Sequence, residues 1–416
     1  MVGVKILFVV NPSSIHSARW INQFSDLGWE IHITPGTLPF TKIHPEYKTG
    51  FFHCPPQITT TFSNWASISK RINFTLTNGI LQIPQKGKLY PVRHQAKIQS
   101  NLIKKIKPDI IHTLGLNINW ENNCISTYES RKLLGNEFNM PWVYSTWGTD
   151  LDFFTVQSDK NHYEVQEILP CIDYLITECK RDELLAYSLG FRGRFLGYFP
   201  AFGGIPLQDY MRLRQPGPVD KRRLIFLKGR DQQGDDGDPV GRAMTAMDAF
   251  KLCEQDLKHY TIVISQASKA IIAKAEELTK TTSLKIQILP YLPYNEILKI
   301  IGSSRVFIAL TVNDGLPSSL VEAMALGSFP IHSDLEPIQE WIIHKKNGLL
   351  ITPENPEICA EAIRKAINED SLVNIAAEIN TDLVEEHLKY EVVKTRAIER
   401  YKKIVDIGSV VSRDEI

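Results

Sequence analysis

The stretch RVFIALTVNDGLPSSLVEAMALG, residues 305–327, predicts a β-strand, a polar loop and an α-helix in succession. The apolar run at the start of this stretch has the length and composition of a buried strand. The segment at its end is rich in small residues and has helical periodicity. Asp314 lies on the loop, where Gly315 permits a sharp turn, and Pro317 favours the start of the helix. Glu322 follows in the first turns of that helix. A strand joined to a helix in this way is the building unit of α/β domains.

The same alternation of strand and helix runs through the whole chain. In the second half, helices are expected near residues 241–255, 268–281, 294–303, 318–327 and 356–368. The strands between them are expected at RLIFLKG (223–229), YTIVIS (260–265), LKIQILP (284–290), RVFIAL (305–310), SFPIHS (328–333) and GLLITP (348–353). In the first half, strands are expected at VKILFVV (4–10), EIHI (30–33), PDIIHT (108–113), PWVYST (141–146), DYLITE (173–178) and GRFLGYF (193–199). Such alternation predicts βαβ units and parallel sheets.

The length of the chain and one break in this rhythm predict the domains. A chain of 416 residues exceeds one ordinary hydrophobic core. Proline and glycine interrupt the series between residues 198 and 223, which indicates a boundary. We therefore predict an N-terminal domain over 1–205, a linker over 206–221, a C-terminal domain over 222–390, and a helix over 391–416 that packs back on the N-terminal domain. The fold class is α/β, with two facing, doubly wound, Rossmann-like domains.

Composition excludes several classes of function. The chain has 47 basic and 47 acidic residues, so no net charge attracts nucleic acid. Its six cysteines form no C-x-x-C pair, which indicates reduced thiols in the cytoplasm. No apolar run has the length of a membrane span. Residues 47–108, however, contain ten basic residues and no acidic one, interleaved with aromatic residues. This stretch predicts either contact with an anionic membrane at its inner face or ordinary solvated helix faces.

The loop and helix of the opening stretch predict an anion site. Amide groups around Leu316, Ser318 and Ser319 lie at the start of the helix, where the helix dipole favours a diphosphate. Glu322 can accept hydrogen bonds from the vicinal hydroxyls of a ribose. An alternative stays open, because Ser319-x-x-Glu322 also has the spacing of a capping box, in which the glutamate serves only its own helix.

A second strand, loop and helix lies at residues 224–250. Lys228, Gly229 and Arg230 end the strand, and Arg242 precedes the next helix. Two guanidinium groups beside a helix N-terminus can stabilise a departing diphosphate. The alternative is that both arginines are solvated and paired with the acidic residues of their own loop.

The second half of the chain resembles the retaining glycosyltransferases of the GT-B fold, the large family 4 also described as glycosyl transferases group 1. Asp314 and Glu322 match the family's acidic-x7-Glu signature. After this signature, EAMALG, FPIHSD, Glu340 and NGLLITP match the sequence that follows it in the family. Gly229 and Arg230 match the family's phosphate-binding arginine and the glycine before it. The resemblance covers most of residues 222–370 with specific motifs, and the first 200 residues loosely.

The resemblance implies roles for these residues. Arg230 and Arg242 would neutralise the leaving β-phosphate, and Asp314 would contact the transferred sugar. The donor would also be bound by Lys228, Gly229, Gly315, Leu316, Pro317, Ser318, Ser319, Glu322 and, near the base, Tyr291. Such enzymes retain the anomeric configuration without a metal, and the nucleotide sugar is a substrate, so no metal and no cofactor are expected.

The resemblance also implies that the N-terminal domain binds the acceptor. NPSSIHSAR (11–19) corresponds to the family's acceptor loop, which makes His16 and Ser17 candidate acceptor-binding residues. His112, in PDIIHTLG, matches the first histidine of a family segment and is a candidate catalytic residue, although a single strand histidine is also common in a core. Asp150, in STWGTDLDFF, is either an acceptor-binding residue or a loop acid that stabilises the fold.

The expected function is that of a cytoplasmic retaining glycosyltransferase. Peripheral association of this enzyme with a membrane is a further expectation. The enzyme would move a sugar from a UDP- or GDP-sugar to a glycan or lipid-linked acceptor in cell-surface polysaccharide biosynthesis. The alternatives are a nucleotide-sugar epimerase of similar fold and a non-catalytic, two-lobed nucleotide-sugar-binding regulator.

Overall fold

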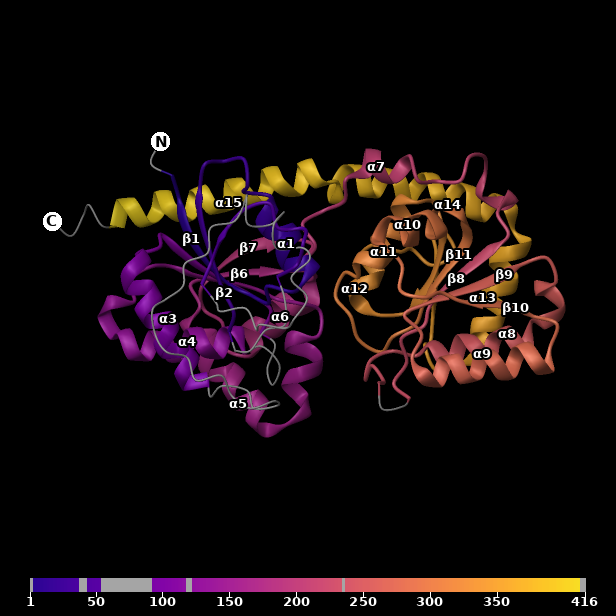
Figure 1. Ribbon diagram of the computed structural model, residues 1–416, viewed down its shortest axis with the longest axis horizontal. Helices are drawn as coiled ribbons and strands as arrows, with labels where there is room; N and C mark the ends of the chain where they lie inside the picture. The colour runs from indigo at the N-terminus through magenta and orange to yellow at the C-terminus, as the bar shows by residue number, and fades with distance from the viewer. Residues whose placement is uncertain (1–2, 37–42, 54–91, 117–121, 234–235, 412–416) are drawn as a thin grey trace, which may run out of the picture. The chain divides into compact units, whose positions relative to one another are not determined.

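The computed structural model describes residues 3–36, 43–53, 92–116, 122–233 and 236–411. Contacts divide the chain into two compact units. Unit 1 comprises residues 1–203 and 393–416, and unit 2 comprises residues 204–392. Each unit is a parallel sheet covered by helices on both faces (Figure 1).

The sheet of unit 1 has the strand order β3-β2-β1-β4-β5-β6-β7. Its strands are β1 Lys5–Val9, β2 Glu30–Thr34, β3 Phe51–Phe52, β4 Ile110–Leu114, β5 Trp142–Ser145, β6 Tyr174–Thr177 and β7 Arg194–Tyr198. All neighbouring strands pair in parallel, and β1, β4 and β5 are almost wholly buried, as expected of a sheet covered on both faces. The order reverses between β1 and β4, where a Rossmann-like sheet opens a crevice at its carboxyl edge.

The sheet of unit 2 has the strand order β10-β9-β8-β11-β12-β13. Its strands are β8 Leu224–Lys228, β9 Thr261–Ser265, β10 Lys285–Ile288, β11 Ser304–Ala309, β12 Phe329–Ser333 and β13 Leu349–Ile351. This is the Rossmann order, and it reverses between β8 and β11. The loops that follow these two strands are those that carry the predicted donor residues.

The helices bury one face each against these sheets. Unit 1 contains α1 Ile15–Asn22, α3 Val92–Ile106, α4 Asn123–Leu134, α5 Asp159–Ile168, α6 Lys180–Ser188 and most of α15 Tyr390–Val411. Unit 2 contains α7 Leu207–Met211, α8 Ala243–Leu252, α9 Lys269–Thr281, α10 Tyr294–Ser303, α11 Ser318–Ala325, α12 Glu336–Gln339, α13 Pro356–Asn368 and α14 Asp370–Leu383. No helix among the described residues is both long enough and apolar enough to cross a bilayer.

Helix α15 contributes to the core of unit 1. Val393, Ala397, Tyr401 and Ile404 are buried with the side chains of β1 and α1. The spacing of these four residues places them on one face of α15, so this face packs against the sheet of unit 1 and is shielded from solvent.

The predicted fold class, two doubly wound Rossmann-like domains, is confirmed, and each predicted strand is present. Three features differ from the expectation. Residues 206–221 were expected as a linker, but they form α7 and the short helix η6 Val219–Lys221 within unit 2, because Leu207, Tyr210 and Val219 are buried there. Helix α14 and strand β3 were not expected. Residues 54–91, most of the basic stretch 47–108 for which membrane contact and solvated helix faces were the two expectations, lie outside the described residues.

Candidate active site

The loops that follow β8 and β11 are bonded to each other through their backbones. The amide of Val312 donates to the carbonyl of Val240 at 2.9 Å, and the hydroxyl of Thr311 donates to the same carbonyl at 3.0 Å. The amide of Arg242 donates to the carbonyl of Leu310 at 2.9 Å. These bonds bring the two predicted motifs together at the point where the strand order reverses, which is the ligand-binding position of Rossmann-like sheets.

Gly229 begins the first loop where the chain passes close to β9. Its amide donates to the carbonyl of Ser265 at 2.7 Å. A Cβ at position 229 would lie 2.7 Å from Cγ2 of Ile264. The glycine is therefore required for the close approach of the loop to β9, in addition to any contact with a ligand.

Helix α11 begins at Ser318, with Pro317 as its N-cap and no capping side chain. Leu316 and Pro317 are buried and hold the preceding loop, whereas Ser318 and Ser319 are partly exposed. The ammonium group of Lys228 lies 3.3 Å from Oγ of Ser319. First-turn amides have no acceptor in their own helix, so the helix start and Lys228 together form a positive site.

Lys228 is held among the charges of both loops. Burial lowers its pKa below the usual lysine value, while the nearby carboxylates of Asp314 and Glu322 act in the opposite direction. A half-buried ammonium group has given up part of its hydration. It can therefore bind a phosphate oxygen more strongly than a solvated lysine does.

Glu322 is only 5% exposed and lies on α11, one turn past the helix start. Its Oε1 accepts a hydrogen bond of 2.5 Å from the hydroxyl of Tyr294. Ser319 is not the N-cap, because the helix begins one residue earlier, and its Oγ faces Lys228. The capping-box alternative is therefore wrong, and a hydroxyl from the neighbouring helix α10 holds the carboxylate of Glu322.

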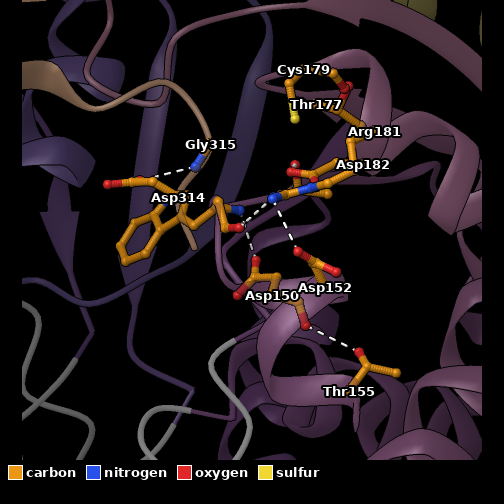
Figure 2. A network of polar contacts seen from close by, with 12 residues as sticks. Asp150, Asp152, Thr155, Thr177, Cys179, Arg181, Asp182, Asp314 and Gly315 are labelled. Carbon is orange, nitrogen blue, oxygen red and sulfur yellow. Dashed lines mark hydrogen bonds and ion pairs between the residues drawn. The ribbon is translucent and has the colours of Figure 1, made fainter. Parts of the chain in front are cut away.

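Asp314 is half-buried on the loop between β11 and α11. Its Oδ1 accepts a hydrogen bond of 2.9 Å from the amide of Gly315, as Figure 2 shows. This bond tightens the turn before the helix and orients the carboxylate. Contact with a transferred sugar stays a prediction.

The two predicted arginines occupy different surroundings. Arg230 is exposed, and its Nε lies 2.5 Å from the carboxylate of Asp238 in the same loop. The guanidinium group of Arg242 is largely buried, bonded to Glu354 at 2.8 Å and to the carbonyls of Pro239 and Gly241. The exposed guanidinium group of Arg230 can exchange the largely buried carboxylate of Asp238 for a phosphate, whereas Arg242 holds the loop in shape. Its predicted contact with a phosphate stays a prediction.

Tyr291, predicted near the base, is fully exposed between β10 and α10. Tyr294, three residues later, was not among the predicted site residues, yet its hydroxyl contacts Glu322. The hydroxyl of Tyr294 also lies 2.6 Å from that of Tyr210, which is buried on α7. The feature of the sequence that could have identified Tyr294 is its hydroxyl, because the polar end of a large aromatic side chain needs a hydrogen-bond partner when it is buried.

We expect Tyr294→Phe to weaken donor binding about tenfold, because it removes a hydrogen bond to a charged group. The donor KM should rise while kcat changes less, since the hydroxyl orients Glu322 and does not touch the reacting atoms. Steady-state kinetics with varied donor would measure both. Tyr260→Phe is the matched control, because this buried tyrosine lies near Arg223, Arg305 and Asp370 instead. An equal rise in KM for both variants would contradict a specific role of Tyr294.

In unit 1, Asp150 organises the loop after β5. It is fully buried, and its Oδ2 accepts hydrogen bonds from the amides of Leu116 and Trp147, both at 2.8 Å, and from the hydroxyl of Tyr144 at 3.0 Å. The hydroxyl of Thr155 donates to the carbonyl of Asp150 (Figure 2). These contacts favour the alternative of a fold-stabilising loop acid.

Arg181 connects the same loop to helix α6. Its guanidinium group contacts Asp152 at 3.1 Å, Asp182 at 2.8 Å and the carbonyl of Gly148 at 2.6 Å (Figure 2). Burial raises the pKa of Asp182 to about 6, against the opposing effect of Arg181. The arginine thus fixes the loop at the carboxyl edge of the sheet, next to the position at which an acceptor is predicted.

His112 lies in the core of unit 1. Its side chain has no exposed surface, Nδ1 is hydrogen bonded to the hydroxyl of Tyr401, and Nε2 is 2.8 Å from Oγ of Ser145. Burial lowers its pKa to about 3, so the ring is neutral at neutral pH. This placement favours the structural alternative for His112.

The two acceptor candidates on α1 are placed differently. Ser17 is fully buried, whereas His16 is partly exposed and its ring lies 6.3 Å from that of Trp147, edge to face. His16 therefore lies beside the loop that Asp150 organises. Across the described part of the chain, no group of three or more His, Cys, Asp or Glu side chains is arranged to hold a metal ion.

Two Rossmann-ordered sheets in one chain are the fold of the GT-B class, and a lysine, an arginine and a helix N-terminus lie at the switch point of the second sheet. Residues 244–382 match the model of the family described as Glycosyl transferases group 1. Through this segment of unit 2, which includes Asp314 and Glu322, the chain is similar to members of that family. The loop from Gly229 to Arg242 precedes the matched segment.

Comparison with individual proteins agrees with this class. A sequence relative, an uncharacterized glycosyltransferase of Methanocaldococcus jannaschii, is 27% identical over 114 residues, which are 27% of this chain and 28% of that protein. Among solved structures, Anabaena HepE in complex with UDP and glucose has a TM-score of 0.65 at 13% identity, covering 96% of this chain and 99% of that one. Sucrose-phosphate synthase of Thermosynechococcus elongatus has a TM-score of 0.67 at 14% identity, covering 97% and 100%. Likeness at such low identity shows the fold.

Proposed function

We propose that the chain is a retaining glycosyltransferase that uses a nucleotide-diphosphate sugar as donor. The observation that carries the proposal is the joining of two loops at the switch point of unit 2, with Lys228 beside Ser319 and the start of α11. This arrangement supports binding of a diphosphate by one ammonium group and first-turn amides. Glu322 lies on α11 and is oriented by the hydroxyl of Tyr294 on α10, which supports recognition of the ribose hydroxyls.

The proposed reaction breaks the bond between the anomeric carbon and the diphosphate oxygen. The acceptor hydroxyl forms the new glycosidic bond on the same face, and its proton passes to the departing diphosphate oxygen. Negative charge grows on the diphosphate as the bond breaks, so Arg230 and Lys228 lower the barrier by binding the leaving group more strongly in the transition state. Asp314 orients the sugar, and this orientation sets the direction from which the acceptor hydroxyl attacks the anomeric carbon.

The proposed donor is a UDP-sugar in preference to a GDP-sugar. HepE, which shares the fold over almost its full length, was solved with UDP and glucose. The proposed acceptor is a glycan or a lipid-linked sugar of cell-surface polysaccharide biosynthesis, bound by unit 1 beside His16 and the loop of Asp150. The roles of His16, Ser17, His112 and Arg242 in transfer stay predictions.

The test is a screen of the full-length protein against UDP-, GDP- and ADP-sugars, with thermal unfolding and released nucleotide as the two measurements. We expect a UDP-sugar at about one hundred times its Kd to raise the unfolding midpoint of unit 2 by about 5–10 °C. We also expect slow release of UDP that a chelator leaves unchanged, because no metal takes part.

Each other outcome of this screen is informative. Binding without release of nucleotide over hours would favour the non-catalytic regulator and overturn the proposal. Conversion of the free donor into an epimeric nucleotide sugar would favour the epimerase and would also overturn the transferase proposal. If only a GDP-sugar stabilises the protein, the proposed transfer reaction would stand, and the proposed donor would change from a UDP-sugar to a GDP-sugar.

A further inference from the structure

A cavity lies in unit 1, between the sheet and α15. Its volume is about 310 Å³, and its walls come from the first residues of β6 and β7 and from one face of α15. The predicted acceptor residues follow the carboxyl ends of strands, whereas this cavity begins at Tyr174 and Arg194, the first residues of β6 and β7. It is therefore separate from the predicted acceptor site.

The edge strand β7 is irregular at this position, which opens the cavity. The pairing of β6 with β7 shifts between Leu175 and Ile176, so that Leu196 is an extra residue on β7. Gly197 follows with a positive φ of 126°, a conformation that favours glycine. Gly197 is part of the cavity lining, and a Cβ at this position would meet only the ring of Phe199, at 3.4 Å.

Three cations line this cavity. They are Arg194 on β7 and Arg400 and Lys403 on α15. None of them forms an ion pair with any residue that the structure describes. Other cations of α15 do have partners, since Lys394 lies 2.6 Å from the carboxylate of Asp26. The cavity thus concentrates positive charge that the described chain leaves uncompensated.

Arg400 carries the strongest indication of a ligand. Its Nε is buried and has no hydrogen-bond partner among the described residues. A buried donor without an acceptor is destabilising, and more so when it is charged. The neighbouring Arg396 adds to the positive field, since its pKa is lowered by burial and by the charge of Arg400. An anion in the cavity would relieve both the missing hydrogen bond and the repulsion.

The rest of the lining is apolar. Phe195, Leu196 and Ile404 contribute no hydrogen-bonding side-chain group, and Tyr174 contributes a single hydroxyl. A nucleobase or a sugar is recognised by several donors and acceptors in fixed positions, and these four side chains do not supply such a set. Cations beside an apolar wall match an anion that is joined to a hydrocarbon group.

We propose that this cavity binds the phosphate group and adjoining hydrocarbon of an anionic amphiphile, the chemistry of an acidic phospholipid headgroup. Arg194, Arg400 and Lys403 bind the phosphate, and Phe195, Leu196 and Ile404 contact the hydrocarbon next to it. The proposal is independent of the donor site in unit 2 and of the proposed transferase reaction.

The test measures binding of soluble dihexanoyl phosphatidic acid to the full-length protein by calorimetry, with inorganic phosphate and dihexanoyl phosphatidylcholine as comparisons. Lys403→Glu reverses one exposed charge at the cavity, and each unit of charge is worth about fivefold, so we expect about 25-fold weaker binding. Lys402→Glu is the matched control, because it makes the same change at the next residue of α15, outside the cavity lining. Arg400→Gln should weaken binding at least fivefold.

The source of the amphiphile is distinguished by co-sedimentation with phosphatidylcholine vesicles that contain phosphatidic acid. Binding to the vesicles that Lys403→Glu weakens supports a membrane lipid, and binding of the soluble form alone supports a free amphiphile at the same site. Equal loss in the Lys402 and Lys403 variants, or equal affinity for inorganic phosphate, would overturn the proposal. Unchanged unfolding midpoints and nucleotide release in the variants show that folding and unit 2 are intact.

Discussion

Glu322→Ala should lower donor binding and transfer about 100-fold, because two hydrogen bonds from ribose hydroxyls to a charged acceptor are lost. The carboxylate is only 5% exposed and is held at 2.5 Å by the hydroxyl of Tyr294, so it is oriented before the donor arrives. A preoriented acceptor binds without the entropy cost of ordering its side chain. The effect should therefore appear in the donor Kd, measured by calorimetry, as well as in kcat/KM.

The control is Glu357→Ala. Glu357 is likewise a glutamate of unit 2 in the early part of a helix, but it is exposed in the first turn of α13. It should leave both donor binding and transfer close to those of the unaltered protein. Native-like donor affinity in Glu322→Ala, with an unchanged unfolding midpoint, would remove the carboxylate from the donor site. A large fall in the midpoint would show instead that Glu322 serves the packing of α10 against α11.

Much of the fold could be predicted from the sequence because parallel strands covered on both faces are continuous apolar runs. RVFIAL, for example, corresponds to β11, in which each residue is buried. Helix α14 was missed because only Glu369 separates it from α13, without a glycine or proline to mark the break. Strand β3 was missed because a pair of two residues has no periodicity to detect.

The candidate site could be predicted in part. The motifs placed Lys228 and Ser319 in one site because Lys228 ends β8 and Ser319 begins the helix after β11, the two strands at the switch point. The contact of Tyr294 with Glu322 could not be predicted, since it depends on how α10 packs beside α11 and joins residues 28 positions apart. The different surroundings of Arg230 and Arg242 also depend on packing, because Glu354 reaches Arg242 from a loop more than a hundred residues away.

Arg230→Ala should lower kcat about 100- to 1000-fold while changing the donor KM much less, as expected when a group that stabilises developing charge is removed. The guanidinium group is exposed, and the carboxylate of Asp238 is its only ion-pair partner among the described residues, so a diphosphate can replace that partner at little cost. Negative charge on the diphosphate is greatest in the transition state, where the bond to the sugar is nearly broken. Single-turnover kinetics would separate this chemical step from donor binding.

Three further variants make the prediction about Arg230 specific. Arg230→Lys keeps the charge but loses the bidentate geometry, so it should recover part of kcat. Asp238→Asn removes the present partner and leaves the cation, so kcat should stay within a few-fold of the original; a loss as large as that of Arg230→Ala would mean that the pair serves only the loop. Arg242→Ala tests the other arginine. A fall in kcat at an unchanged unfolding midpoint supports direct contact with the phosphate, whereas a lowered midpoint with kcat nearly intact assigns Arg242 to holding the loop through Glu354.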